Sequence, residues 1–309
     1  MDLREPRILG RTGLKVGRLG VAASYGAPAG AFEEAFEDGC NYFYWGSIRR
    51  SGMREAIQNL CRKGKRDDLV IVVQSYSRSA TLMEVSYHRA LKRLVLDHAD
   101  VLLLGWYDRR PSNRVLDRAM AMKSSGKFRF LGLSGHNRKL FRELVNEGIF
   151  DIFHIRYNAA HRGAETETFP YLQKEDRPGI VAYTATRWGR LLKQKKMPPG
   201  ERAPSASDCY RFVLSHPAVD VCLTGPKNWE QMKEALRTLD LGPLGDTQVE
   251  RMRRIGDSFV ARRDLCRAND HPASSSTHSK ECHRFCSIPH QPRYPAWQSL
   301  QNLCRFHLF

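Results

Sequence analysis

Long apolar runs are missing from this 309-residue sequence, and no window approaches the ~20 consecutive apolar residues that a membrane-spanning helix needs. The opening segment, MDLREPRILG, contains acidic side chains and no apolar run, so it matches neither a secretory signal nor a lipidation motif. We therefore expect a cytoplasmic protein that makes no contact with a membrane.

Acidic side chains are few compared with basic ones, at 33 against 50, which gives a formal net charge of +17. Such a charge suits an anionic partner, for example a nucleotide cofactor or nucleic acid, and it also suits a solvated basic surface. The basic residues are spread along the whole chain and lack the interleaved aromatic residues of single-strand binders. The pattern therefore disfavours nucleic acid as a partner.

Recognisable metal-binding patterns are also missing. The eight cysteines fall into two groups. Cys40, Cys61, Cys209 and Cys222 lie in apolar segments and are expected to be reduced core thiols. The other four, Cys266, Cys282, Cys286 and Cys304, lie near the C-terminus. The segment CHRFC has histidines nearby, but its C-x3-C spacing has no second pair to complete a zinc or iron–sulfur site. We expect no metal.

Apolar runs alternate with amphipathic stretches between residues 18 and 240. The runs are rich in apolar and β-branched residues, as parallel strands buried on both faces are, and cover 18–24, 41–44, 69–74, 100–105, 128–134, 151–155, 179–184 and 219–224. Helical spacing follows in 82–95, 112–123 and 138–148. Eight strand–helix repeats predict an α/β protein with a closed (β/α)8 TIM barrel. An open, doubly wound sheet is the alternative, disfavoured because no strand is followed by G-x-G-x-x-G.

Segments outside the repeats complete the expected organisation. RILGRTGLKVGRL reads as an N-terminal β-hairpin that plugs the barrel's amino-terminal end. After about residue 262 the composition turns Ser- and His-rich and irregular. We predict a barrel over 1–262 and an irregular, disordered Cys/His-containing tail over 263–309.

The carboxyl ends of the predicted strands carry an unusual number of Arg, His and large aromatic residues, which suits an anionic, planar ligand. LTGPKNWEQMKEAL places Lys227 between the eighth strand and a helix, where helix N–H groups favour phosphate. An ordinary helix start with Asn228 as N-cap explains the same segment equally well.

Six segments, taken in order along the chain, resemble the aldo-keto reductase superfamily over about residues 7–240. They are RILGRTGLKVGRLG, GCNYFYWG, FLGLSGHNRKLFRELV, RYNAAHRGAE, VAYTATRWGRLL and LTGPKNWEQMKEAL. The resemblance implies an NADP(H)-dependent barrel oxidoreductase. It assigns cofactor binding to Ser134, His154, Tyr183, Gly225, Lys227, Gln231 and Glu234. His154 stands where the family has glutamine, and Ala235 where it has asparagine.

The catalytic positions depart from the family pattern at all four places. Tyr44 replaces the aspartate, Arg49 the proton-donating tyrosine, Gln74 the lysine and Gly105 the histidine. The usual proton relay cannot operate without them. The remaining candidates for catalysis are Tyr44, Arg49 (or Arg50), Tyr76 and His136, with His154 and His161 as further proton shuttles. For each histidine taken alone, a hydrogen-bonded structural role is the favoured explanation.

Three functions remain open. The first is an NADP(H)-dependent oxidoreductase with a non-standard proton donor, acting on a small-molecule carbonyl or alcohol. The second is a non-redox enzyme that binds an acidic substrate in an Arg/Tyr/His pocket, since a barrel does not fix the chemistry. The third is a non-catalytic, nucleotide-binding barrel. The substrate, the preference for NADP over NAD and the oligomeric state cannot be derived from the sequence.

Overall fold

The computed structural model describes residues 2–46, 51–172 and 176–269, with no side chains described from 262 onward. The chain divides into two units, Met1–Ser258 and Phe259–Phe309. The first holds every strand. The described part of the second, residues 259–269, is the C-terminal part of one helix.

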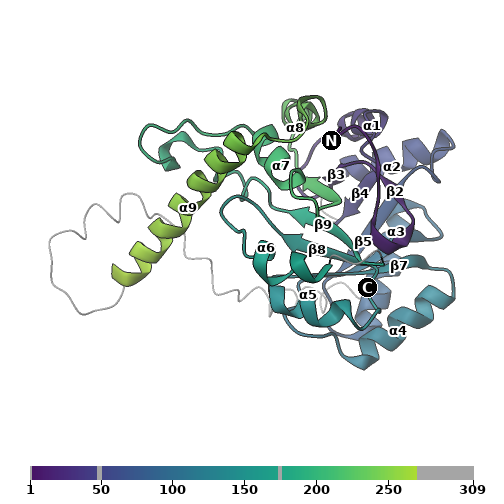
Figure 1. The fold of residues 1–309 in the computed structure, drawn as a ribbon. Helices are drawn as coiled ribbons and strands as arrows, with labels where there is room; N and C mark the ends of the chain where they lie inside the picture. The colour runs from purple at the N-terminus through teal and green to yellow at the C-terminus, as the bar shows by residue number, and fades with distance from the viewer. Residues whose placement is uncertain (1, 47–50, 173–175, 270–309) are drawn as a thin grey trace. The chain divides into compact units, whose positions relative to one another are not determined.

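Eight parallel strands close into a barrel, which confirms the predicted fold (Figure 1). Each strand pairs with its neighbours in chain order, and the last pairs with the first. The strands are β3 (Leu19–Ala22), β4 (Tyr42–Trp45), β5 (Val70–Ser75), β6 (Ala99–Leu104), β7 (Phe128–Gly135), β8 (Ile152–Arg156), β9 (Gly179–Tyr183) and β10 (Val221–Thr224). Their predicted positions agree to within about two residues, the scatter normal for element boundaries.

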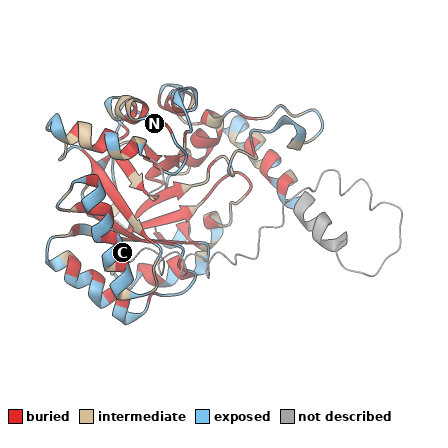
Figure 2. Ribbon diagram, turned by 180° about the vertical axis from the view of Figure 1, so that it is seen from behind, coloured by how far each residue is buried: buried red, intermediate tan, exposed pale blue. Residues whose placement is uncertain are grey.

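Helices follow the strands and cover the outside of the barrel. They are α1 (Ala29–Glu37), α2 (Gly52–Arg62), α3 (Ala80–Leu94), α4 (Asn113–Ser124), α5 (Arg138–Val145), α6 (Ala164–Glu167), α7 (Ala206–Leu214) and α8 (Trp229–Leu241). A further helix, α9 (Asp246–Asn269), follows α8 in the chain. Figure 2 shows strands that are mostly buried and helices that are exposed on their outer faces. The apolar stripe of each amphipathic helix therefore packs on the sheet.

The N-terminal hairpin plugs the barrel, as the sequence predicted. Its strands β1 (Arg7–Ile8) and β2 (Lys15–Val16) pair antiparallel around a short 3-10 turn. Leu9, Leu14 and Val16 from this segment belong to the same buried cluster as the inward side chains of the barrel strands. The hairpin therefore closes the amino-terminal end, which leaves the carboxyl end for a ligand.

Three carboxylates, those of buried Asp100 and Asp220 and of partly buried Asp151, link neighbouring strands at the amino-terminal end. Each lies at the start of a strand and accepts a hydrogen bond from a backbone N–H of the preceding strand: Ile71 to Asp100, Leu131 to Asp151 and Ile180 to Asp220. Each also pairs with a cation from another element. Ion pairs therefore fix the register at the end of the barrel opposite the mouth.

The C-terminal region differs from the prediction in one respect. Helix α9 continues to Asn269, past the change in composition at residue 262. The structure does not describe the side chains of Cys266, Cys282, Cys286 and Cys304, or those of the histidines after residue 269. The expected domain boundary and the expected absence of a metal there stay predictions.

Among the described residues, no helix combines the length and the apolar character that crossing a membrane requires. No group of three or more His, Cys, Asp or Glu side chains in that part of the chain is arranged to hold a metal ion. Cys40, Cys209 and Cys222 are buried free thiols, and burial raises the pKa of each, that of Cys40 to about 12. Cys61 is less buried than the sequence suggested.

Candidate active site at the mouth of the barrel

The inward side chains at the carboxyl ends of the strands form one layer above the apolar core. Tyr44 and Tyr183 pack directly on the core cluster. The strand register places Gln74 beside Leu103, Ser134 beside His154, and Arg156 beside Tyr183. The barrel therefore brings together residues that the sequence predicted as a site, on seven of its strands: Tyr44, Gln74, Gly105, Ser134, His154, Tyr183 and Gly225.

The floor of this layer contains a fully buried polar pair that the sequence did not reveal. The Tyr42 hydroxyl and His154 Nε2 lie 2.8 Å apart, and both residues are almost inaccessible to water. Burial lowers the pKa of His154 to about 3, so its imidazole is neutral at physiological pH. His154 therefore cannot serve as a cationic proton shuttle, and one of its ring nitrogens is engaged with Tyr42.

Gln74 fills the space that a larger residue at position 105 would occupy. A Cβ built on Gly105 would lie 1.9 Å from Gln74 Nε2, so the amide rests on the glycine backbone. Gln74 Oε1 is buried and has no hydrogen-bond partner among the described atoms. Since an unpaired buried acceptor is costly, this oxygen is a position at the mouth that a hydrogen-bond donor would satisfy.

The Tyr44 side chain likewise fills the space that a side chain at position 46 would occupy. A Cβ on Gly46 would lie 2.4 Å from the Tyr44 hydroxyl oxygen. Burial, followed by a hydrogen bond shared with Tyr76, raises the pKa of Tyr44 well above its usual value. The phenol of Tyr44 is therefore neutral, and Gly46 is required to accommodate it.

We predict that Gly46→Ala lowers the free energy of unfolding by about 1–3 kcal/mol, because the new methyl group would overlap the Tyr44 ring. In a Tyr44→Ala background the same substitution is expected to cost less than about 1 kcal/mol. Chemical denaturation of the four proteins in this cycle measures the coupling. An equal cost in both backgrounds would contradict the proposed contact.

Tyr76 follows β5 and is the accessible member of the phenol pair, with 41% of its surface exposed. Its ring packs edge-on against Trp106 at 5.2 Å between ring centroids. Its hydroxyl donates to the Gly46 carbonyl oxygen at 3.5 Å, a long hydrogen bond. The phenols of Tyr44 and Tyr76 thus meet at Gly46.

Ser134 and Tyr183 are held by the backbone of neighbouring strands. Ser134 Oγ accepts a hydrogen bond from the Trp106 N–H at 3.1 Å, which leaves its own hydrogen able to donate. The Tyr183 hydroxyl donates to the Gly135 carbonyl oxygen at 2.9 Å, which fixes the ring. Both side chains are therefore preorganised at one side of the mouth.

Arg156, a strand-end residue to which the sequence assigned no catalytic or cofactor role, acts on these residues. Burial and the charge of Arg156 lower the pKa of His136, against the opposing effect of Asp108. Arg156 also lowers the pKa of Tyr183, although burial raises it more. Arg156 lies on the inward face of β8, two residues after His154, and this alternation along the strand was the signal that could have identified it.

The start of α8 is organised largely by its own side chains. Asn228 caps the helix by accepting from the Gln231 N–H, while Gln231 Oε1 accepts from the Lys227 N–H, each at 3.0 Å. Glu234 accepts from the Ser207 hydroxyl at 2.8 Å and from Arg237 at 3.0 Å. Gln231 and Glu234 thus have structural partners, and Lys227 is exposed. Gly225 allows the Tyr25 ring to lie close, 2.4 Å from where a Cβ would be.

Backbone strain gathers at the same end of the barrel. Trp106, Thr184, Arg187 and Trp188 have positive φ angles between 51° and 62°, although none of them is glycine. Such conformations are costly for bulky or β-branched residues and are concentrated at functional sites. Arg78 supports one of these turns by donating to the carbonyl oxygens of Gly105 and Trp106.

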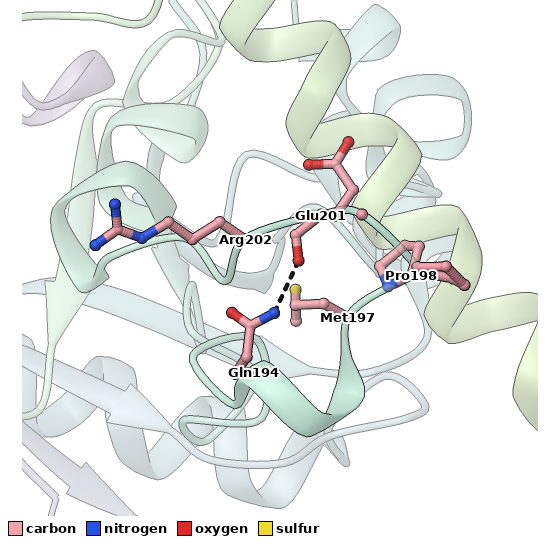
Figure 3. A pocket seen from close by; sticks show the side chains of 7 residues that line it. Gln194, Met197, Pro198, Glu201 and Arg202 are labelled. Atoms are coloured by element: carbon pink, nitrogen blue, oxygen red, sulfur yellow. Dashed lines mark hydrogen bonds between the residues drawn. The ribbon is translucent and has the colours of Figure 1, made fainter.

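Two surface pockets are lined by residues other than those of the mouth. One, of about 510 Å³, is formed by the loop after β9 and is lined by Gln194, Met197, Pro198, Pro199, Gly200, Glu201 and Arg202 (Figure 3). The Gln194 amide donates to the Glu201 carbonyl oxygen across it. A second, of about 710 Å³, is lined by residues that begin α3 and α4. Neither contains any of the inward residues of the mouth.

Of the predicted catalytic residues, Tyr44 and Tyr76 lie together, and His136 lies on the Tyr183 side, with 6.3 Å between those ring centroids. Arg49 and Arg50 lie outside the described residues. The structure thus defines a class of protein: a (β/α)8 barrel with a plugged amino-terminal end and an aromatic, hydrogen-bonding site at its carboxyl end.

Comparison with known proteins places the chain within that class. The model of the aldo/keto reductase family matches residues 29–208, more than half of the chain. The chain therefore belongs to the aldo/keto reductase family, whose members are typically NAD(P)-dependent oxidoreductases.

Two relatives illustrate the similarity. L-galactose dehydrogenase from Arabidopsis thaliana is 24% identical over 242 residues, which cover 69% of this chain and 75% of the plant protein. An aldo-keto reductase from Bacillus halodurans, solved in its holo form, matches with a TM-score of 0.67 at 18% identity. That match covers 81% of this chain and 96% of the bacterial one, and at this identity it establishes the fold alone.

Proposed function

We propose that this protein is an NADP(H)-dependent oxidoreductase that interconverts a carbonyl group and an alcohol in a small molecule. The observation that carries the proposal is the preorganised group of Ser134, His154 and Tyr183 on the adjacent strands β7, β8 and β9. These positions match those at which aldo-keto reductases hold the nicotinamide. When bound, the reduced nicotinamide supplies the hydride.

The residues of the mouth fit such a cofactor. The Ser134 hydroxyl can donate to a carboxamide oxygen because its own oxygen is already supported by Trp106. The Tyr183 ring, anchored on Gly135, offers an aromatic surface to a flat heterocycle. The unpaired Gln74 Oε1 calls for a donor such as an amide N–H or an alcohol hydroxyl. Lys227, exposed after β10, supplies a positive charge for a phosphate.

The substrate side of the mouth is aromatic with one identified cation. Tyr25, Tyr76, Trp106 and Trp188 are 38–54% exposed near the ends of the strands. Arg156 acts electrostatically on His136 and Tyr183 and suits a substrate with an acidic group. The plant relative is named for L-galactose, so a polyhydroxylated carbonyl compound is one class to test. A cytoplasmic location stays a prediction of the sequence.

The test is a fluorescence titration of the purified protein with NADPH. We expect saturable binding, and we expect Lys227→Ala to weaken NADPH binding about tenfold while leaving NADH binding nearly unchanged, because the lysine would contact the additional phosphate of NADPH. Lys92→Ala, which removes an exposed lysine from α3, is the matched control and should bind like the wild type. Failure of the wild-type protein to bind NADPH would refute the proposed function.

A non-catalytic, cofactor-binding barrel is the second candidate. It is favoured by the replacement of all four residues of the family's proton relay, at Tyr44, Arg49, Gln74 and Gly105. This candidate predicts tight NADPH binding without NADPH oxidation across a broad panel of aldehydes and ketones. Turnover of any member of that panel excludes it.

A further inference from the structure

The site retains two phenols that meet at its edge, and their arrangement assigns a role to each. We infer that Tyr76 is the proton donor of this barrel and that Tyr44 is the residue that positions and supports it. The inference rests on the proposed oxidoreductase function. Neither residue occupies the position of the family's catalytic tyrosine, which is Arg49 here.

The first support is the geometry around Gly46. The Tyr44 hydroxyl lies against the backbone of Gly46, within 2.4 Å of where a Cβ would be. The Tyr76 hydroxyl reaches the carbonyl oxygen of the same residue at 3.5 Å. The missing side chain therefore leaves room for two phenols from adjacent strands to share a hydrogen bond.

The second support is the direction of that hydrogen bond. The hydrogen of the Tyr76 hydroxyl is directed at the Gly46 carbonyl oxygen, so the Tyr76 oxygen is the acceptor and Tyr44 the donor. The pKa shifts have the matching signs, since the bond raises the pKa of Tyr44 and lowers that of Tyr76. Burial still leaves the pKa of Tyr76 above its usual value, so Tyr76 carries its proton at neutral pH. When Tyr76 loses its proton, the hydrogen bond from Tyr44 would therefore stabilise the phenolate.

The third support comes from the other tyrosines of the mouth. The hydroxyl hydrogens of Tyr183 and Tyr107 are committed to backbone carbonyl oxygens at 2.9 and 3.0 Å, whereas that of Tyr76 makes only a long contact. Tyr42 is fully buried against His154. Tyr76 is 41% exposed and is oriented by Trp106, whose turn Arg78 supports. It therefore combines an available proton with a fixed ring.

A bound reduced nicotinamide would supply a hydride to the substrate carbonyl carbon and would itself become the oxidised cofactor, while the π electrons of the carbonyl would move to its oxygen. That oxygen takes the proton of the Tyr76 hydroxyl, whose O–H bond breaks. The phenolate that results accepts the hydrogen bond from Tyr44 until water returns a proton to exposed Tyr76. Alcohol oxidation follows the reverse path.

The first experiment needs neither cofactor nor substrate. Protein containing 13Cζ-labelled tyrosine is titrated by NMR, with Tyr76→Phe and Tyr44→Phe used to assign the two signals. We expect Tyr76 to ionise at lower pH than Tyr44, and we expect Tyr44→Phe to raise the pKa of Tyr76. Among the described residues, the other groups that act on the pair are Tyr25 and Tyr183, and burial raises the pKa of both. Ionisation of Tyr44 first, or an unchanged Tyr76 in Tyr44→Phe, would overturn the inference.

The second experiment measures NADPH oxidation with 4-nitrobenzaldehyde as the probe. Tyr76→Phe is expected to bind NADPH like the wild type and to react roughly 10²–10⁴-fold more slowly. Tyr44→Phe should shift the basic limb of the pH–rate profile to higher pH. Tyr171→Phe, on the surface beneath Arg142, is the control and should keep the wild-type rate. A Tyr76→Phe variant that keeps more than half of the rate would refute the inference, whereas absent NADPH binding would refute the proposed function itself.

Discussion

Asp220→Asn is expected to lower the free energy of unfolding by about 3–5 kcal/mol, the cost of breaking a buried ion pair from one side. The Asp220 carboxylate is fully buried, accepts two hydrogen bonds from Arg177 at 2.7 Å each and pairs with Arg7 at 3.2 Å. Arg18, whose pKa burial lowers to about 10, lies in the same cluster. An amide at position 220 would leave these guanidinium groups without their anion.

Urea denaturation of the wild type and the variant measures this cost. Asp67→Asn is the matched control, because Asp67 is exposed, and its effect should stay within about 0.5 kcal/mol. A loss of less than about 1 kcal/mol for Asp220→Asn would show that the cluster does not secure β9 against β10. The same logic applies to Asp100 and Asp151, which hold other strand pairs.

The second large effect depends on pH. The pKa of His154 is about 3 in the folded protein and about 6.5 in the unfolded chain, so the unfolded chain binds the additional proton between these values. Stability therefore falls as the pH is lowered through this window, by roughly 2–3 kcal/mol between pH 7 and pH 4.5.

His154→Gln is expected to remove this component, because an amide does not titrate. The measurement is the free energy of unfolding of both proteins at pH 7 and pH 4.5. The difference between the two pH values should be smaller in the variant by the amount just given. Equal pH dependence in the two proteins would mean that His154 is not held neutral against Tyr42.

Much of the fold could be derived from the sequence because it depends on local patterns. Buried strands leave apolar runs, helices leave a three- and four-residue spacing, and their eightfold alternation fits a closed barrel. Leu9, Leu14 and Val16 also mark the plugging hairpin by their apolar character. The helix beyond residue 262 was missed because its sequence lacks a clear apolar stripe.

The site was only partly predictable, because its decisive features are contacts across the barrel. Ser134, His154 and Tyr183 could be placed by matching strand ends. The fit of Gln74 over Gly105, and of Tyr44 over Gly46, depends on side-chain volumes brought together by folding. In each pair a large polar side chain occupies the space beside a glycine.

The close approach of Gln74 to Gly105 limits which side chains position 105 can accept. Restoring one family residue alone, such as histidine at position 105, would displace Gln74, whose Nε2 already occupies that space. At the mouth, Tyr76 is the more accessible phenol and Tyr44 its partly buried partner.

The most direct test of the account is a crystal structure of the protein soaked with NADPH. We predict that the nicotinamide ring lies against Tyr183, that its carboxamide contacts Ser134, and that Tyr76 Oη is the phenol oxygen nearest the reactive face of the ring. A cofactor bound elsewhere on the chain, or a nicotinamide whose reactive face is remote from Tyr76, would contradict it.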